Sequence, residues 1–232
     1  MNRRQVLSAL GASAAGLCAG SAAHADHGAK PAKGGNPLSQ FHAYLCAFHT
    51  AKKDARLVFE AHHYCMPVRE GVHQCIIFST DGKTKTPLIL GVEYIISDQI
   101  YRSLPKEEQK YYHPHAYEVT SGLLIAPELE VEAETKLMEG LANTWGKTWH
   151  TWPDPEKDLP LGEPLLMWSA TKDGMISDET LAKRDEQFKC STKTIRQRRA
   201  HIGPVPQLDA PRSLDELGRQ WTADGPDEPR RK

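Results

Sequence analysis

Two short segments place histidine beside glutamate, tyrosine or cysteine, the side chains that bind metals or transfer protons. Their sequences are EAHHYC at residues 60–65 and HPHAYE at residues 113–118. Imidazole nitrogens and carboxylates are borderline ligands that suit zinc, iron, manganese or copper. Three of them that converge and leave a coordination position open would form a catalytic or binding site. The two segments therefore support the hypothesis that the chain binds a single transition metal, such as zinc or iron.

The candidate ligands come from both segments and from one further strand-like segment. As a strand, residues 56–66 would direct His62 to one face and His63 to the other, and a one-residue shift in register exchanges them. In the second segment the two histidines would share a face, with the glutamate opposite. The spacing matches no metal motif of established specificity. The full set of candidates is His62, His63, His113, His115, Glu118 and Glu93.

A structural role for the histidines is the favoured alternative, because imidazoles on half-buried strands are commonly hydrogen-bonded to backbone or carboxylate groups. The role of Glu93 is open in the same way. It lies in residues 87–97, where both faces are otherwise apolar, so we expect a central strand. A carboxylate on such a strand needs a partner. Glu93 either binds or orients the metal, or it forms a buried ion pair with a lysine or arginine.

Other catalytic chemistries have weaker support in the sequence. The chain contains no Gly-x-Ser-x-Gly motif. A phosphate-binding loop is also missing, because Gly82-Lys83-Thr84 lacks the required upstream glycine. A nucleophilic cysteine–histidine pair that uses Cys65 or Cys46 stays open, since such partners meet in space and not in sequence. The sequence does not decide whether the chain is an enzyme.

The elements that would position these residues show both helical and strand-like patterns. Apolar residues at helical spacing predict helices over residues 38–50 and 129–144. Capping residues and proline predict short helices over residues 98–104 and 105–112, and a last helix from Ser177. This order predicts an α+β fold, a mainly antiparallel sheet flanked by helices in a single domain. Strands are expected over residues 56–66, 73–80, 87–97, 115–125, 147–152 and 165–170.

One pair of cysteines is placed symmetrically about a predicted turn. Cys65 and Cys75 are equally far from Glu70, so a hairpin closed by residues 69–71 would bring them opposite each other. Cross-strand cysteines can form a disulfide, although antiparallel geometry often strains it. Two buried free thiols are the favoured alternative.

The two ends of the chain differ from its central part. Residues 1–25 resemble a twin-arginine signal peptide, because Arg3 and Arg4 precede a weakly apolar run and Ala23-His24-Ala25 fits a signal peptidase site. We therefore expect export to the periplasm. Residues 26–37 would form a flexible leader, residues 38–202 the α+β domain, and residues 203–232 a disordered tail rich in proline and charge.

Composition argues against two classes of partner. The chain has 29 basic and 30 acidic side chains and a formal net charge of −1, which offers no electrostatic footprint for nucleic acid. After removal of the signal peptide, no stretch is long and apolar enough for a transmembrane span. The oligomeric state does not follow from the sequence.

Several motifs occur together and in a fixed order along the chain. They are EAHHYC at residues 60–65, LGVEYIIS at 90–97, LPKEEQK at 104–110, HPHAYEV at 113–119, SG at 121–122 and LPLG at 159–162. With these motifs, residues 38–190 resemble the oil-body-associated protein family, and the leader indicates a bacterial, exported member. Plant members are associated with seed lipid droplets, so the resemblance implies contact with lipid. It implies no catalytic residues.

Three functions remain open at this point. The first is an exported binding or accessory protein for a lipid or another small apolar ligand. The second is a metal-dependent enzyme that uses His62 or His63 with His115 and Glu118, supported by Glu93. The third is a structural, histidine-rich core with partner binding through the charged C-terminal tail.

Overall fold

Residues 35–203 are described by the computed structural model, with the exception of residues 53, 84, 153 and 158. They all belong to a single unit of the chain, which begins at Gly34. The predicted signal peptide, the leader up to residue 34 and the tail from residue 204 lie outside the described residues.

The strands of the described chain form one antiparallel sheet that closes on itself. Their order is β4-β3-β2-β1-β7-β6, and β6 pairs back with β4 along its whole length. The two-residue strand β5 lies beside β6. Six strands therefore enclose a small barrel, into which alternate side chains of each strand point. The strands are β1 (Ala43–Ala51), β2 (Asp54–Arg69), β3 (Val72–Phe78), β4 (Ile89–Ser97), β5 (His113–Pro114), β6 (Thr144–His150) and β7 (Leu165–Ser169).

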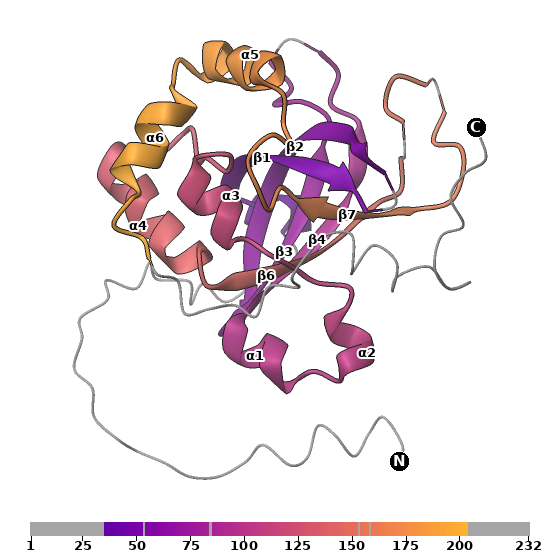
Figure 1. Ribbon diagram of the computed structural model, residues 1–232. Coiled ribbons are helices and arrows are strands. Elements are labelled where there is room, and N and C mark those ends of the chain that lie inside the picture. Colours follow the sequence, from indigo (N-terminus) through magenta and orange to yellow (C-terminus); the bar gives the residue numbers. More distant parts are fainter. Residues whose placement is uncertain (1–34, 53, 84, 153, 158, 204–232) are drawn as a thin grey trace, which may run out of the picture. The chain divides into compact units, whose positions relative to one another are not determined.

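The helices are short and gather in two places. Figure 1 shows α3, α4, α5 and α6 together on one side of the sheet, and α1 and α2 at another. Ser97, Ser177 and Ser191 cap α1, α5 and α6, each by accepting a backbone N–H. None of the described helices combines the length and the apolar composition that crossing a membrane requires. The elements are the 3-10 helix η2 (Pro37–Gln40), α1 (Asp98–Ser103), α2 (Lys106–Gln109), α3 (Ala116–Ser121), α4 (Val131–Leu141), α5 (Asp178–Phe188) and α6 (Thr192–Arg198).

The predicted α+β class with a mainly antiparallel sheet is confirmed, but the sheet dominates more than expected. We predicted a sheet flanked by helices, whereas β4 and β6 close it into a barrel. This closure joins residues 91–97 to residues 144–150, and such a distant pairing leaves no local pattern in the sequence.

The helix predicted over residues 38–50 was wrong. Residues 43–51 form β1, and only η2 precedes it. Leu45 and Ala47 point into the barrel, while Cys46 and Phe48 are covered from outside, so all four are buried. A strand that is buried on both faces loses the alternation of apolar and polar residues by which strands are recognised.

Two further predictions were wrong: the strand over residues 115–125 and the single last helix from Ser177. His113 and Pro114 form β5, and the chain then turns into α3, which ends at Gly122 with a φ of 81°. The β-branched residues Val119 and Thr120 favour a strand, but packing of α3 against α4 and α6 overrides that preference. The last helix is divided at Lys189 into α5 and α6.

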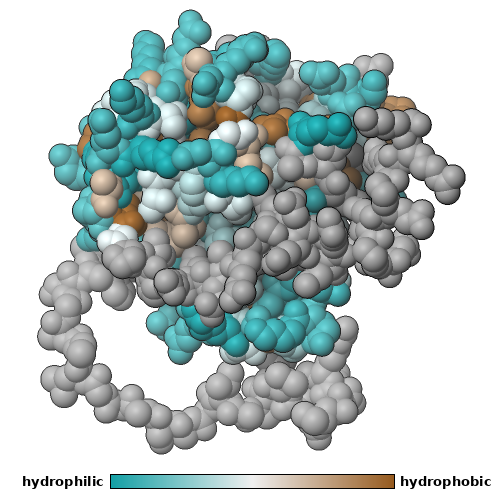
Figure 2. Space-filling model, in the orientation of Figure 1, coloured by the Kyte–Doolittle hydropathy of each residue, from teal (hydrophilic) through white to brown (hydrophobic). Residues whose placement is uncertain are grey.

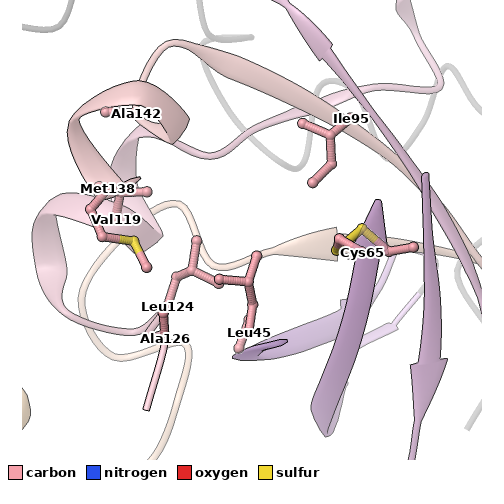
Figure 3. Packing of buried hydrophobic residues seen from close by; sticks show 10 residues of the cluster. Leu45, Cys65, Ile95, Val119, Leu124, Ala126, Met138 and Ala142 are labelled. Atoms are coloured by element: carbon pink, nitrogen blue, oxygen red, sulfur yellow. A yellow bond between two sulfur atoms is a disulfide. The ribbon is translucent and has the colours of Figure 1, made fainter. Parts of the chain in front are cut away.

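The largest apolar cluster fills one end of the barrel. In Figure 3, Leu45 from β1 and Leu124 meet there, with Val119 and Met138 on the helices beyond them. All four side chains are buried, and burial of each contributes roughly 1.5–3 kcal/mol. This cluster fixes α3 and α4 over the end of the barrel.

The predicted β2–β3 hairpin is confirmed, and it settles the pairing of the cysteines. Gly71 turns the chain with a φ of 68°, a conformation that favours glycine. Cys65 and Cys75 lie directly opposite, with Cα atoms 4.0 Å apart, and form a disulfide. The preference for two free thiols was therefore wrong, because the register brings the two sulfur atoms together.

Candidate metal centre

Side chains along β2 point alternately to its two faces, and this separates the adjacent residues His62 and His63 of the first motif. His63 points into the barrel beside the disulfide, whereas His62 points outward. We call the histidines and glutamates around the inward side the inner cluster. The inner cluster consists of His49, His63, Glu93, His113, His115 and Glu118, all of which are buried.

Glu93 lies at the centre of the inner cluster and is 3 % exposed. Its Oε2 atom is 3.0 Å from His63 Nε2. Its Oε1 atom is 3.3 Å from His115 Nε2 and 3.5 Å from His113 Nε2. Ligands of a tetrahedral metal, at about 2.0–2.1 Å from the ion, lie about 3.3 Å from one another. The spacing of these atoms suits a metal's coordination shell as well as it suits hydrogen bonds.

Two of these histidines have their second ring nitrogen fixed by a hydrogen bond. His63 Nδ1 donates to the carbonyl of Ala61 over 3.1 Å. His115 Nδ1 is 2.7 Å from Thr144 Oγ1, and that hydroxyl gives its own proton to the carbonyl of Leu141. The hydroxyl must therefore accept from His115. In the neutral form both imidazoles then present an unprotonated Nε2 to Glu93, as metal-bound histidines do.

Two other groups of the inner cluster have buried polar atoms without a hydrogen-bond partner among the described residues. Both ring nitrogens of His113 are in this state, and so is Oε2 of Glu118. Glu118 Oε1 lies 3.9 Å from His115 Nε2, beyond hydrogen-bond reach. Leaving a buried polar group unpaired costs about 1–3 kcal/mol, so these atoms indicate that a partner binds there.

Gly146 on β6 leaves space at the same point. A Cβ atom on this residue would lie 2.5 Å from His115 Nε2 and 2.8 Å from His113 Nε2, and closer still to Glu93 Oε1. The three ligand atoms thus converge on the space beside Gly146. A glycine keeps that position clear, and any other residue would fill it.

The charges of the inner cluster also suit a cation. Burial lowers the pKa of His113 to about 3 and, together with the charge of His63, holds the pKa of His49 well below its ordinary value. Burial alone would raise the pKa of Glu93, but His115 and His63 outweigh it and lower that pKa well below its usual range. Burial and the charge of Glu93 raise the pKa of Glu118. The cluster therefore holds an ionised carboxylate beside the neutral imidazoles of His49 and His113.

Helices α5 and α6 hold in place the segment that carries His115 and Glu118. Arg184, on α5, donates to the carbonyls of Gly122 and Leu123, each over 3.0 Å. Arg199 follows α6 and donates to the carbonyls of Val119 and Leu124. Both guanidinium groups are fully buried. They tie α3 and the loop after it to the C-terminal helices.

His62 belongs to a different set of residues on the outward side of β1 and β2, which we call the outer cluster. Its Nδ1 is 2.8 Å from the Tyr44 hydroxyl and its Nε2 is 3.2 Å from Glu60 Oε1. The Cys46 thiol donates to the same oxygen over 3.7 Å. Ligand atoms of Cys46, Glu60 and His62 lie within 4.8 Å of one another, so the geometry permits a metal here as well.

The structure brings five of the six predicted ligands together in the inner cluster and places His62 apart from them. Glu118 lies on the same side as His115, and not opposite as predicted, because α3 replaces the expected strand. The alternative of a lysine or arginine partner for Glu93 is not supported, since its ion pairs within the described chain are with histidines.

Sequence reasoning missed two histidines and one glycine of this region. His49 lies 3.1 Å from His63, and His150 lies 3.0 Å from His49. His49 stood in the stretch wrongly predicted as a helix. As a strand, the sequence Leu45-x-Ala47-x-His49 would have placed this histidine on the inward face. No local signal identifies Gly146.

Comparison with known proteins identifies the family. A family model described as "Protein of unknown function (DUF1264)" matches residues 35–203. Oil body-associated protein 1B of Arabidopsis thaliana is 36% identical over 170 residues, which cover 72% of this chain and 70% of the relative. Oil body-associated protein 1A of Zea mays is 38% identical over 170 residues, 72% of this chain and 71% of the relative.

A third relative extends the match. Oil body-associated protein 2B of Zea mays is 32% identical over 203 residues, covering 86% of this chain and 79% of the relative. No solved structure matches the chain. The resemblance inferred from the motifs is confirmed, and the chain belongs to the DUF1264 family, together with the oil body-associated proteins.

Proposed function

We propose that the chain is a metal-binding protein whose inner cluster holds a divalent transition metal. The ligands are Oε1 of Glu93 and the Nε2 atoms of His113 and His115. The observation that carries the proposal is the orientation of the imidazoles. Nε2 of His63 and Nε2 of His115 point at the Glu93 carboxylate while their Nδ1 atoms donate to Ala61 and Thr144, so in the neutral form both present a lone pair that a cation would share with the carboxylate.

Hydrogen bonds from the two histidines to Glu93 would stabilise this arrangement less well than a metal ion. A hydrogen bond from His63 or His115 to Glu93 needs an added proton on Nε2, and each such proton creates a buried imidazolium. Glu93 neutralises one such imidazolium, so a second one would be a buried charge without a counterion of its own. A divalent ion supplies the positive charge at one point and leaves the imidazoles neutral, which is the form that binds metal.

The space beside the proposed metal limits what it can bind. A cavity of about 10 Å³ separates the polar side of the cluster from an apolar wall. That volume holds about one water molecule. A metal-bound water fits there next to Glu118, and a larger substrate requires movement of α3 and the loop after it. The cavity is lined by His49, His63, Glu93, His115, Glu118 and by Leu45, Ala47, Ile95, Leu124 and Leu141.

The test is the metal content of the full chain, purified without a histidine tag or chelator and measured by mass spectrometry. We expect at least one equivalent of a transition metal in the wild type. His115→Gln should lose it, whereas the matched outer-cluster variant His62→Gln should retain it. Circular dichroism checks that both variants fold. A folded wild-type protein without metal, which also takes up none on dialysis, would refute the proposal.

A second candidate function is binding of a lipid or another small apolar ligand. The relatives are named oil body-associated proteins. A groove of about 270 Å³ on the outward side of the β2–β3 hairpin is lined by Tyr64, Ile76 and Phe78, with Leu38, Phe41 and Pro87. The face in Figure 2 is mainly hydrophilic where its residues are coloured, with small hydrophobic areas. We assign an apolar ligand to the groove because most of its lining residues are apolar or aromatic.

A fluorescent fatty acid titrated into the full chain tests this second function. Ile76→Ser should weaken binding about tenfold, because it removes apolar contact area from the groove. Val68→Ser is the matched control, since Val68 is exposed on the same hairpin and does not line the groove. Equal affinity of both variants and the wild type would exclude the groove as the binding site.

Export to the periplasm is proposed on the leader sequence alone. Cell fractionation of a bacterium that expresses the full chain would test it. Replacement of Arg3 and Arg4 by lysine should retain the protein in the cytoplasm if the twin-arginine pathway is used. Unchanged export of this variant would contradict the predicted pathway.

A further inference from the structure

The two carboxylate oxygens of Glu93 face different histidines. Oε1 faces His113 and His115, and it also accepts a hydrogen bond from Thr148 Oγ1 over 2.9 Å. Oε2 faces His63. The side chain therefore stands between two sets of ligands and not within one.

The set on the Oε2 side has the geometry of a second metal position. His63 Nε2 is 3.0 Å from Glu93 Oε2 and 3.1 Å from His49 Nε2. The ligand atoms of these three residues all lie within 4.8 Å of one another, as do those of Glu93, His113 and His115. These separations again approach the edge of about 3.3 Å in a tetrahedral site.

His49 also has the support that a metal-bound histidine needs. Its Nδ1 is 3.0 Å from His150 Nε2, so the ring is fixed through the nitrogen that faces away from Glu93. The side chain is 2 % exposed. Contacts with Ala61, Thr144 and His150 thus hold the rings of His63, His115 and His49 in place.

We propose that Glu93 bridges two metal ions, one bound by His113 and His115 through Oε1 and the other bound by His49 and His63 through Oε2. The inference rests on the proposed function, because both ions share Glu93. Metal ions bridged by a carboxylate lie about 3.5–4 Å apart and stabilise a ligand between them. The water-sized cavity touches His49, His63 and His115 together. Two divalent ions beside one ionised glutamate leave positive charge, so the ligand is hydroxide or another anion of that size.

The experiment is a titration of the metal-depleted full chain with Mn²⁺, followed by the bound equivalents and by electron paramagnetic resonance. We expect two equivalents, with the spectrum of an exchange-coupled pair when both are bound. His49→Gln should bind one equivalent and give the spectrum of an isolated Mn²⁺, because glutamine keeps a polar side chain but removes the imidazole. The exposed His42→Gln variant is the control and should behave as the wild type.

The outcomes separate the two proposals. One equivalent in the wild type, unchanged in His49→Gln and lost in His115→Gln, would overturn the second site and leave the first intact. No bound metal in a folded wild type would overturn both. The coupled spectrum is measured on the wild type, so a misfolded His49→Gln variant does not prevent the test. Two equivalents without coupling would also overturn the bridging role of Glu93.

Discussion

The inner and outer clusters both combine histidine with glutamate and contain the adjacent residues His63 and His62, yet only the outer cluster adds a tyrosine and a cysteine, and the hydrogen bonding of the two differs. In the outer cluster, the Tyr44 hydroxyl supplies a proton to His62, which donates to Glu60, and the Cys46 thiol donates to the same carboxylate. Burial raises the pKa of Tyr44 and Cys46, so both keep their protons. The outer cluster is complete without a metal.

Fewer polar atoms of the inner cluster are paired. In their neutral form His63 and His115 present lone pairs to Glu93, and buried atoms of His113 and Glu118 make no hydrogen bond among the described residues. Proximity of histidine and glutamate therefore does not by itself distinguish a metal site from a hydrogen-bond network. The arrangement of hydrogen-bond donors and acceptors distinguishes them. Variants that change one cluster and leave the other intact test this difference.

The largest effect is expected from Gly146→Ala. The added Cβ would occupy the space among Glu93 Oε1, His113 and His115, so the variant should lose metal entirely and lose stability. Gly140→Ala is the matched control, because a Cβ there meets nothing within 4 Å. In the interior of α4 that change should stabilise the protein by about 0.5–1 kcal/mol. Metal content and thermal unfolding measure both effects, and full metal retention in Gly146→Ala would contradict the site.

Replacing the glutamate of each cluster by glutamine compares the two clusters directly. Glu93→Gln keeps the shape but removes the negative charge, so we expect metal affinity to fall by at least about 100-fold. Glu60→Gln makes the same change in the outer cluster and should leave metal affinity unchanged. The Glu60 side chain is 25% exposed, and its carboxylate already accepts hydrogen bonds from His62 and Cys46. Isothermal titration with Zn²⁺ provides the measurement. Similar losses in both variants would show that the clusters are not distinct.

A smaller effect is expected from Thr144→Val, which removes the acceptor of His115 Nδ1 and leaves the ligand itself in place. Loss of such an orienting group typically reduces metal affinity by about 10–100-fold. The same titration checks this prediction. Thr135→Val, which removes a solvent-exposed hydroxyl hydrogen bond from α4, should have no effect on affinity. Wild-type affinity in Thr144→Val would mean that His115 is not held as a ligand.

The smallest effect concerns acid stability of the metal-free protein. Burial lowers the pKa of His113 and of His150 to about 3, below the ordinary value of 6.5. Below pH 6.5 the unfolded chain binds protons that the folded chain does not, so stability falls as the pH decreases toward 3. Between pH 7.5 and 5.5 each histidine contributes roughly 1 kcal/mol to the loss. Urea unfolding of the metal-free protein at pH 7.5 and at pH 5.5 measures this loss. Equal free energies of unfolding at the two pH values would contradict the prediction.

Local patterns predicted much of the fold. Turn residues identified the β2–β3 hairpin, and serine caps identified the starts of α1 and α5. Residues 43–51 and 116–121 were assigned wrongly because burial on both faces and tertiary packing decide their structure. Closure of the sheet through β4 and β6 depends on distant residues and cannot be read from either segment alone.

The candidate site was partly predictable for a related reason. Glu93 was recognised as a carboxylate that needs a partner, and the two histidine motifs contributed His63, His113 and His115. His49 was missed with its strand. The choice between His62 and His63 depends on the register of β2, which only the paired strands fix.

The most direct test of the central claim is a crystal structure of the protein purified without chelator, with anomalous diffraction recorded at the absorption edge of the metal it carries. We predict an anomalous peak about 2.0–2.2 Å from Glu93 Oε1 and from the Nε2 atoms of His113 and His115. No peak at the inner cluster, or a peak only beside Cys46, Glu60 and His62, would contradict the account.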